Sequence, residues 1–399
     1  MIKRLSVLLI VSFWLQTGLI AQNSYSINSI STSKTSNNTV TCTIYQIGDK
    51  YYAYSGGDGN KVDAFEISNT GVLQPIESYT VTGGKKAVRG LVADQVHGKN
   101  FLFAGLKGGN MVEVFEINDD GTLKSVSSIQ DTEQTYLGIV ITLQVVHMSQ
   151  DSYLFVGGLE KNPGLSCFRI LPDGSLEHVQ SMADTEAVFT DGIIGMSLHQ
   201  VQGKTVLMTG GFQDNGLSNF QVFEDGHFEH ISSISDDHIR YLNGTYPVIS
   251  VRLNNRNFVV VGHRHHIYYK PTPWIKDRET YYYHGDAVSV FMLDNQAELI
   301  PRSLFKGDAS TLIKGQTRLH SLPIDDKNAL VAIATRDDQS IQLCVLKETG
   351  LLVDAGKIKT GFPIYYGLAG HIINGEMYLL AGSVGGNELV TYKLDKNAN

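Results

Sequence analysis

The stretch Phe101–Leu123, FLFAGLKGGNMVEVFEINDDGTL, carries the pattern that decides the fold. It opens with a short apolar run ending in Gly105 and continues, after a polar connection, as Met111–Ile117, in which apolar and polar side chains alternate. Such alternation is typical of a half-buried β-strand. The Asp120–Gly121 step that follows supplies the positive φ of a tight hairpin turn. The stretch therefore predicts two antiparallel strands and the start of a third.

The same phrase recurs along the chain, with an aromatic or aliphatic residue at the centre of its second strand. These central residues are Phe65, Phe115, Phe168, Phe220, Phe291, Leu343 and Tyr392. They lie about 50 residues apart, except for one interval that is roughly 20 residues longer. A period of this length, built from short strands without helical periodicity, is the signature of a β-propeller. We therefore predict an all-β, seven-bladed β-propeller.

The last repeat is one strand short, because few residues follow Leu394. The segment Tyr25–Ile30 resembles the fourth strand of another repeat, Lys124–Ile129, and it precedes a predicted first inner strand, Val40–Tyr45. This predicts that the N-terminal strand completes the last blade, which closes the ring and removes exposed strand edges. Residues 22–399 then form a single domain.

The N-terminal segment has the pattern of a secretory signal peptide. Lys3 and Arg4 precede the mostly apolar run Leu5–Ile20, and Ala21 offers a small residue for cleavage. The sequence predicts a signal peptide over residues 1–21 and a secreted or periplasmic protein without a transmembrane segment after its removal. An uncleaved N-terminal anchor is the alternative.

Composition excludes several classes of protein. The formal charge is −8, from 32 Lys and Arg against 40 Asp and Glu, so a binder of nucleic acid through its whole surface is excluded. A hydrophobic content of 42% and aromatic content of 9% exclude a disordered chain. Cys42, Cys167 and Cys344 lie far apart in apolar runs, which predicts buried thiols and no disulfide framework.

The repeated phrase resembles that of a known family. A strand ending in Gly-Gly, then Leu-Ser-X-Phe-X-Ile/Val, then Asp-Gly-X-Leu is similar to the seven-bladed lactonase-like propellers, which include bacterial 6-phosphogluconolactonases. The resemblance covers nearly all of residues 22–399, and its motifs are those of turns and strand centres. It implies the propeller fold, with a lactonase-type hydrolase as one candidate activity. No catalytic residue of that family can be matched onto this sequence.

The long interval contains the most unusual composition of the chain. It falls between the second and third strands of the fifth repeat, from Gly262 to Asp286, on the face where propellers usually bind ligands. This loop holds four of the 13 histidines and five of the 19 tyrosines. From Val251 to Thr280, Lys and Arg outnumber Asp and Glu, so the segment is a local positive island.

Positive charge beside aromatic rings suits an anionic carbohydrate, such as a uronate or a sulfated sugar, because guanidinium groups pair with carboxylate or sulfate. The leading prediction is a polysaccharide lyase, in which Arg or His neutralises the carboxylate while His or Tyr transfers protons. The predicted catalytic residues are His263, Arg264, His284, Tyr246 and Tyr268, with Tyr269 or Tyr283 as alternatives to Tyr268. The predicted substrate-binding residues are Arg89, Lys270, Trp274, Arg318 and Tyr366.

Other interpretations of the same residues stay open. His263 and His265 could share one side of an extended chain and hold a divalent metal. The protein could instead be a lactonase-type hydrolase, or bind a carbohydrate or protein without catalysis, and the loop could be a lid packed on its own blade. Acidic triplets recur before the inner strands and predict either a structural cap in each blade or a ring of acids around a cation. They are Asp131–Glu133, Asp184–Glu186 and Asp236–His238.

Overall fold

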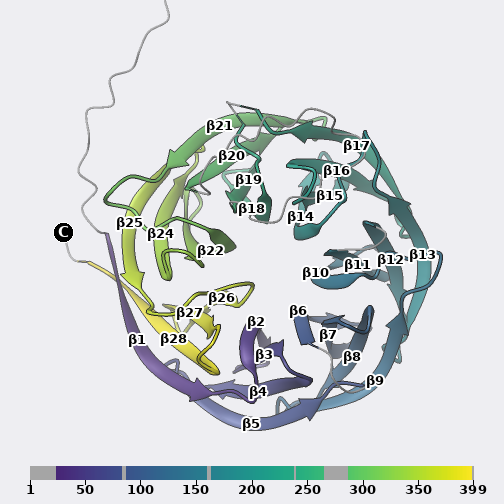
Figure 1. Ribbon diagram of the computed structural model, residues 1–399, viewed down its shortest axis with the longest axis horizontal. Coiled ribbons are helices and arrows are strands. Elements are labelled where there is room, and N and C mark those ends of the chain that lie inside the picture. Colours follow the sequence, from purple (N-terminus) through teal and green to yellow (C-terminus); the bar gives the residue numbers. More distant parts are fainter. Residues whose placement is uncertain (1–23, 83–86, 160–162, 238–239, 265–285, 398–399) are drawn as a thin grey trace, which may run out of the picture.

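The computed structural model describes residues 24–82, 87–159, 163–237, 240–264 and 286–397. All regular structure in these residues is β-strand, arranged as seven four-stranded antiparallel sheets that stand as blades around a central axis (Figure 1). The predicted all-β, seven-bladed β-propeller is confirmed. Within the same residues, no helix combines the length and apolar character needed to cross a membrane.

Each blade runs from an inner strand at the axis to an outer strand at the rim (Figure 1). Blades 1 to 4 consist of β2 (Asn38–Ile47), β3 (Lys50–Asp58), β4 (Lys61–Ile67) and β5 (Leu73–Thr80); β6 (Ala87–Val96), β7 (Lys99–Lys107), β8 (Met111–Ile117) and β9 (Leu123–Gln130); β10 (Ile139–His147), β11 (Ser152–Leu159), β12 (Gly164–Ile170) and β13 (Leu176–Ala183); and β14 (Ile193–Val201), β15 (Lys204–Gly211), β16 (Gly216–Val222) and β17 (Phe228–Ser235). Blades 5 to 7 consist of β18 (Thr245–Leu253), β19 (Arg256–His263), β20 (Ala287–Leu293) and β21 (Leu299–Lys306); β22 (Gln316–Asp325), β23 (Asn328–Thr335), β24 (Ser340–Lys347) and β25 (Leu352–Lys359); and β26 (Leu368–Ile373), β27 (Glu376–Ser383), β28 (Glu388–Lys396) and β1 (Tyr25–Lys34).

The Asp-Gly turns join neighbouring blades as well as neighbouring strands. Gly121 has a φ of 80°, which side chains other than glycine rarely adopt. A Cβ atom on Gly121 would lie 2.3 Å from the Tyr52 ring of the preceding blade. The Tyr52 hydroxyl donates a hydrogen bond of 2.9 Å to the carbonyl of Asp119 in the same turn. The turn therefore requires glycine for its backbone and for its contact with the next sheet.

The apolar core is divided among the interfaces between blades. Seven clusters of buried side chains each lie between two adjacent sheets, as expected when sheets pack face to face. The three cysteines are free and buried within these sheets, as predicted. Burial raises the pKa of the Cys42 thiol to about 12, so this thiol is un-ionised at neutral pH.

The N-terminal strand closes the ring, as predicted. Strand β1 pairs antiparallel with β28, from Tyr25 opposite Lys396 to Lys34 opposite Glu388, and forms the outer strand of blade 7. It extends four residues beyond the predicted segment, which ended at Ile30. The first and last parts of the chain therefore share one sheet (Figure 1).

Candidate functional site

Bulges in the inner strands bring one ring of side chains to the axis. The register shifts in β2, β6, β10, β14, β18 and β22 leave one or two residues unpaired near the start of each strand. Bulges of this kind re-aim side chains. Together with the equivalent position of blade 7, which precedes β26, the bulge ring consists of Val40, Arg89, Ile141, Ile194, Tyr246, Thr317 and Tyr366. We call the face beside these strand starts the mouth face.

The bulge ring closes the axis with apolar and aromatic side chains. Five of its members, Val40, Ile141, Ile194, Tyr246 and Tyr366, belong to one buried cluster that also contains Phe212. The rings of Tyr246 and Tyr366 are stacked, with centroids 5.7 Å apart, and their hydroxyls are joined by a hydrogen bond of 2.7 Å. Blades 5 and 7 therefore meet across the axis.

Arg264 extends this contact toward the mouth face. Its Nη1 donates a hydrogen bond of 2.9 Å to the Tyr246 hydroxyl, and its guanidinium lies 5.1 Å from the centroid of the Tyr246 ring. The guanidinium of Arg264 also lies 5.3 Å from the Tyr365 ring centroid, and that of Arg336 lies 5.5 Å from the same centroid. We call Arg264, Arg336, Tyr246, Tyr365 and Tyr366 the mouth cluster.

The mouth cluster is positively charged at neutral pH. Burial is the main cause that raises the pKa of Tyr246 and of Tyr366 above the usual value for a phenol, so both hydroxyls stay protonated. Arg264 and Arg336 carry their charges, and neither forms an ion pair with a carboxylate among the described residues. The cluster therefore presents two guanidinium groups from neighbouring blades around one aromatic ring.

A cleft lies at the junction of blades 1 and 2. It is lined by residues of both blades, among them Arg89 and Lys107. Arg89 forms an ion pair with Asp58, and its charge also acts on Tyr366. Arg89 and Tyr366, both predicted to bind substrate, therefore lie close enough to interact near the axis. Arg318, the third such residue, lies deeper along β22.

His263 takes a structural position. Its imidazole is 4% exposed, and Nε2 is 3.0 Å from Ser289 Oγ, whose own hydroxyl is directed at the Arg240 carbonyl. Nε2 is therefore the donor, while Nδ1 has no partner. Burial lowers the pKa of His263 to about 3, so the ring is neutral. This position does not favour the catalytic and metal-binding roles predicted for His263.

Several predicted site residues fall in the segment 265–285, outside the described residues. They are His265, Tyr268, Tyr269, Lys270, Trp274, Tyr283 and His284. Their predicted roles therefore stay predictions. In the part of the chain that is described, no three His, Cys, Asp or Glu side chains come together closely enough to hold a metal ion.

Comparison with known proteins gives a likeness in fold alone. No family model matches the sequence, and no curated protein matches it. Among solved structures, the crystal structure of a protein from Lactobacillus plantarum superposes with a TM-score of 0.60 at 12% sequence identity. The likeness covers 84% of this chain and 87% of that one. It supports the propeller.

The acidic loops of the mouth face act as structural caps. Asp131, Asp184 and Asp236 each accept a hydrogen bond from the backbone N–H six residues later, at 2.9, 2.9 and 2.6 Å. These carboxylates therefore close the loops that lead into β10, β14 and β18. The arrangement favours the predicted structural cap over the predicted ring of acids.

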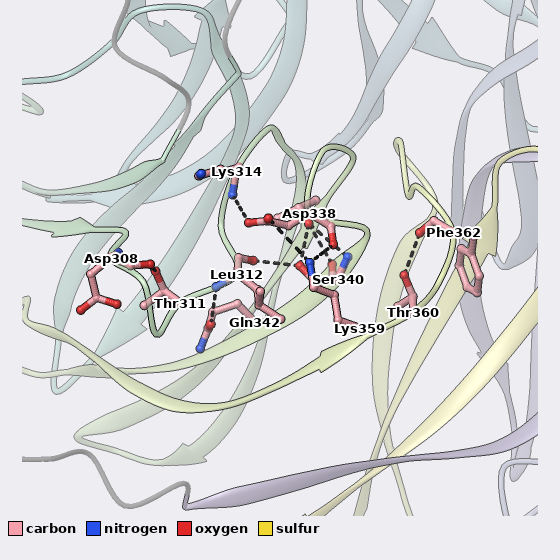
Figure 2. A network of polar contacts seen from close by, with 11 residues as sticks. Asp308, Thr311, Leu312, Lys314, Asp338, Ser340, Gln342, Lys359, Thr360 and Phe362 are labelled. Atoms are coloured by element: carbon pink, nitrogen blue, oxygen red, sulfur yellow. Dashed lines mark hydrogen bonds and ion pairs between the residues drawn. The ribbon is translucent and has the colours of Figure 1, made fainter.

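The loop before β22 is tied to its blade by other polar groups (Figure 2). The Lys314 N–H donates to Asp338 Oδ2 at 2.8 Å, and the Leu312 N–H donates to Gln342 Oε1 at 3.1 Å. The Ser340 hydroxyl donates to the Leu312 carbonyl at 2.9 Å. Rigid loops of this kind hold the mouth face in place around the cluster.

Replacing Asp131 with alanine is expected to lower the free energy of unfolding by about 1–3 kcal/mol, the cost of leaving a buried donor without a partner. The buried donor is the N–H of Leu137, and the Thr135 hydroxyl would lose the same acceptor. Urea unfolding measures the change. Asp131→Asn retains an acceptor oxygen and should lose less. Equal stability of Asp131→Ala and the unchanged protein would contradict the cap.

Sequence reasoning missed Tyr365 and Arg336. A signal for Arg336 was present, because Ala334-Thr335-Arg336 ends its second strand as Gly262-His263-Arg264 ends the equivalent strand of blade 5. Both arginines therefore occupy the same position in adjacent blades. Tyr365 carried no such signal, since its place beside both guanidinium groups depends on how three blades are packed.

Proposed function

We propose that this propeller binds an anionic carbohydrate, of the uronate or sulfated class, on its mouth face. The observation that carries the proposal is the pair of guanidinium groups, Arg264 and Arg336, beside the half-buried ring of Tyr365. Guanidinium groups bind carboxylate or sulfate through paired hydrogen bonds, and an aromatic ring packs against a sugar. Lys107 adds a positive charge in the cleft between blades 1 and 2, where Arg89 is paired with Asp58.

Binding is favoured over elimination by the protonation states of the described groups. An elimination needs a base to remove the proton next to the uronate carboxylate. His263 is buried within its blade, and Tyr246 and Tyr366 are held protonated by burial. Polysaccharide lyase activity would require a base from the segment 265–285. A lactonase-type hydrolase is the second candidate, favoured by the motifs shared with the lactonase-like propellers.

The predicted signal peptide fits this proposal. Acidic polysaccharides are found outside the cytoplasm, and the pattern of residues 1–21 predicts export. We therefore propose that the protein works in the periplasm or outside the cell.

Replacing Arg264 with alanine is expected to weaken binding of a uronate oligosaccharide by roughly 10- to 100-fold, or about 1.5–3 kcal/mol, the range for a hydrogen bond to a charged group. Arg336→Ala should act in the same direction. Titration calorimetry with oligogalacturonate and with a neutral oligosaccharide of the same length measures the difference. Arg252→Ala is the matched control, because Arg252 is an exposed arginine of the same blade.

Two outcomes would contradict the proposal. One is equal affinity of the unchanged protein and Arg264→Ala for the uronate ligand. The other is a loss of thermal stability in Arg264→Ala together with no detectable binding of the uronate ligand to the unchanged protein. That result is expected if the segment after Arg264 is only a lid on its blade. Ultraviolet absorbance of unsaturated uronate products, measured in the same mixtures, separates a lyase from a binding protein.

A further inference from the structure

Arg318 is a cation on the inner strand β22 that lacks a partner. Its Nε atom is buried and makes no hydrogen bond, and among the described residues no carboxylate pairs with it. The one titratable group that acts on the pKa of Arg318 is the Cys42 thiol. Burial keeps this thiol un-ionised, so it supplies no counter-charge. Arg318 as a whole is intermediate in exposure, and a guanidinium largely removed from bulk water without a counter-charge is costly to the folded state.

The other six blades have small residues where blade 6 has Arg318. Arg318 of the inner strand pairs with Ala334 of the second strand. In blades 1 to 4, the equivalent inner-strand residue pairs with a glycine near the end of the second strand. In blade 5 the equivalent inner-strand residue is Pro247, which lies against Gly262. In blade 7 it is Gly367, which lies against Gly382. The equivalent residues are Thr41, Gly90, Thr142, Gly195, Pro247 and Gly367. Arg318 is therefore the one long side chain of this layer.

The layer next to Arg318, on the side away from the mouth face, is reached by solvent. The side chains of the bulge ring are buried, apart from Arg89. Two residues after Arg318 and its equivalents along each inner strand, the side chains are intermediate in exposure in five of the seven blades. They are Thr43, Val92, Gln144, Ile249 and His320. Their exposure, on strands at the centre of the ring, indicates a space on the axis large enough for water-sized groups.

This space is neutral apart from Arg318. The inner-strand segments that surround it contain no Asp or Glu, and they are 41–44, 90–93, 142–145, 195–198, 247–250, 318–321 and 367–370. His320 as a whole is intermediate in exposure, but its ring lies against Gly370. Desolvation of the ring and the neighbouring charge of Arg318 lower its pKa to about 4, so the imidazole adds no charge at neutral pH and retains one N–H donor. Arginine itself keeps its charge when buried. A single positive charge therefore faces the solvent-reached layer at the centre of the ring.

We propose that the axis of the propeller holds a small anion, chloride or a carboxylate, against the guanidinium of Arg318 and beyond the bulge ring as seen from the mouth face. The anion would supply the counter-charge that the chain does not. The site is separate from the carbohydrate site of the proposed function, because the buried ring of Tyr246, Tyr366 and their neighbours lies between them.

Thermal unfolding of the full chain against chloride concentration tests this site. Ionic strength is kept constant with a bulky organic sulfonate, too large for the axis. The melting temperature should rise and saturate with chloride, because a ligand of the folded state stabilises it in proportion to its occupancy. Acetate in place of chloride tests the carboxylate, and a saturable rise with either anion supports the site. No saturable rise with either would overturn it.

The arginine variants assign the effect to its residue. Arg318→Met should lose the anion-dependent rise, whereas Arg252→Met, at an exposed arginine of an inner strand, should keep it. Equal dependence in both variants would overturn the proposal. Should Arg318→Met fail to fold, the unchanged protein still decides, through crystals grown in bromide. An anomalous peak beside the Arg318 guanidinium is expected, and its absence there would overturn the site.

Discussion

A chain that lacks residues 24–34 is expected to lose most of its stability. Strand β1 supplies the outer strand of blade 7, and its Tyr25 and Ile27 side chains are buried in the core between blades 6 and 7. Burying one large apolar side chain contributes about 1.5–3 kcal/mol. The loss of two is therefore a large fraction of the roughly 5–15 kcal/mol that stabilises a typical domain. Urea unfolding, followed by tyrosine fluorescence, measures the change.

The deletion also has a rescue experiment. A synthetic peptide of residues 25–34 should bind the shortened chain and restore its unfolding midpoint, because β28 would otherwise present an unpaired edge. A peptide with Ile27→Asp should not restore it, since the carboxylate would enter the apolar cluster. The chain that begins at Ser24 is the control and should unfold like the full chain. A shortened chain as stable as this control would refute closure by β1.

The fold could be predicted from sequence because its signals are local. The Asp120–Gly121 turn needs glycine for its φ. The alternation in Met111–Ile117 marks a strand, although the strand proves to be buried on both faces, with Glu113 buried as well. Both are repeated about every 50 residues, so the number of blades follows from the number of copies. Closure was predictable for a related reason, since the last copy lacked a strand that Tyr25–Ile30 could provide.

The site was predictable only in part. Arg264, Tyr246 and Tyr366, three of the predicted site residues, lie together, but the direction of His263 could not be inferred from its neighbours. Strand β19 extends through His263, and a shift of one residue reverses the face to which a strand side chain points. The sequence placed His263 at the start of a long loop, where an extended conformation was one of several alternatives. Its contact with Ser289 depends on strand pairing that the inserted segment obscures.

The contact between the buried carboxyl groups of Asp184 and Asp214 also depends on packing that the sequence does not reveal. Asp184 appeared in the sequence as one of several similar loop acids, whereas Asp214 attracted no attention. In the structure both are buried, and the Asp191 N–H donates to each, at 3.1 Å to Asp184 Oδ1 and 2.8 Å to Asp214 Oδ2. Burial and the nearby Asp184 raise the pKa of Asp214 to about 9. Asp214 is therefore protonated and uncharged at neutral pH.

Replacing Asp214 with asparagine is expected to remove a loss of stability that the unchanged protein undergoes as pH rises from 3.8 to about 9. The pKa of Asp214 is about 9 in the folded state against 3.8 for the free side chain, so between these values the folded state binds the extra proton. Stability due to this group is complete at acid pH and falls as pH rises, by at most about 1.4 kcal/mol per unit. Asparagine is neutral throughout and removes this dependence.

Urea unfolding of both proteins across this pH range measures the effect. As pH rises from 3.8 toward 9, the free energy of unfolding of the unchanged protein should fall relative to that of Asp214→Asn, and the difference should level off above about pH 9. Asp119→Asn, at an exposed carboxylate, is the matched control and should follow the unchanged protein. Parallel pH profiles for Asp214→Asn and the unchanged protein would show that Asp214 is ionised in the fold. In that case burial and the nearby Asp184 would not be enough to raise the pKa of Asp214 in the fold.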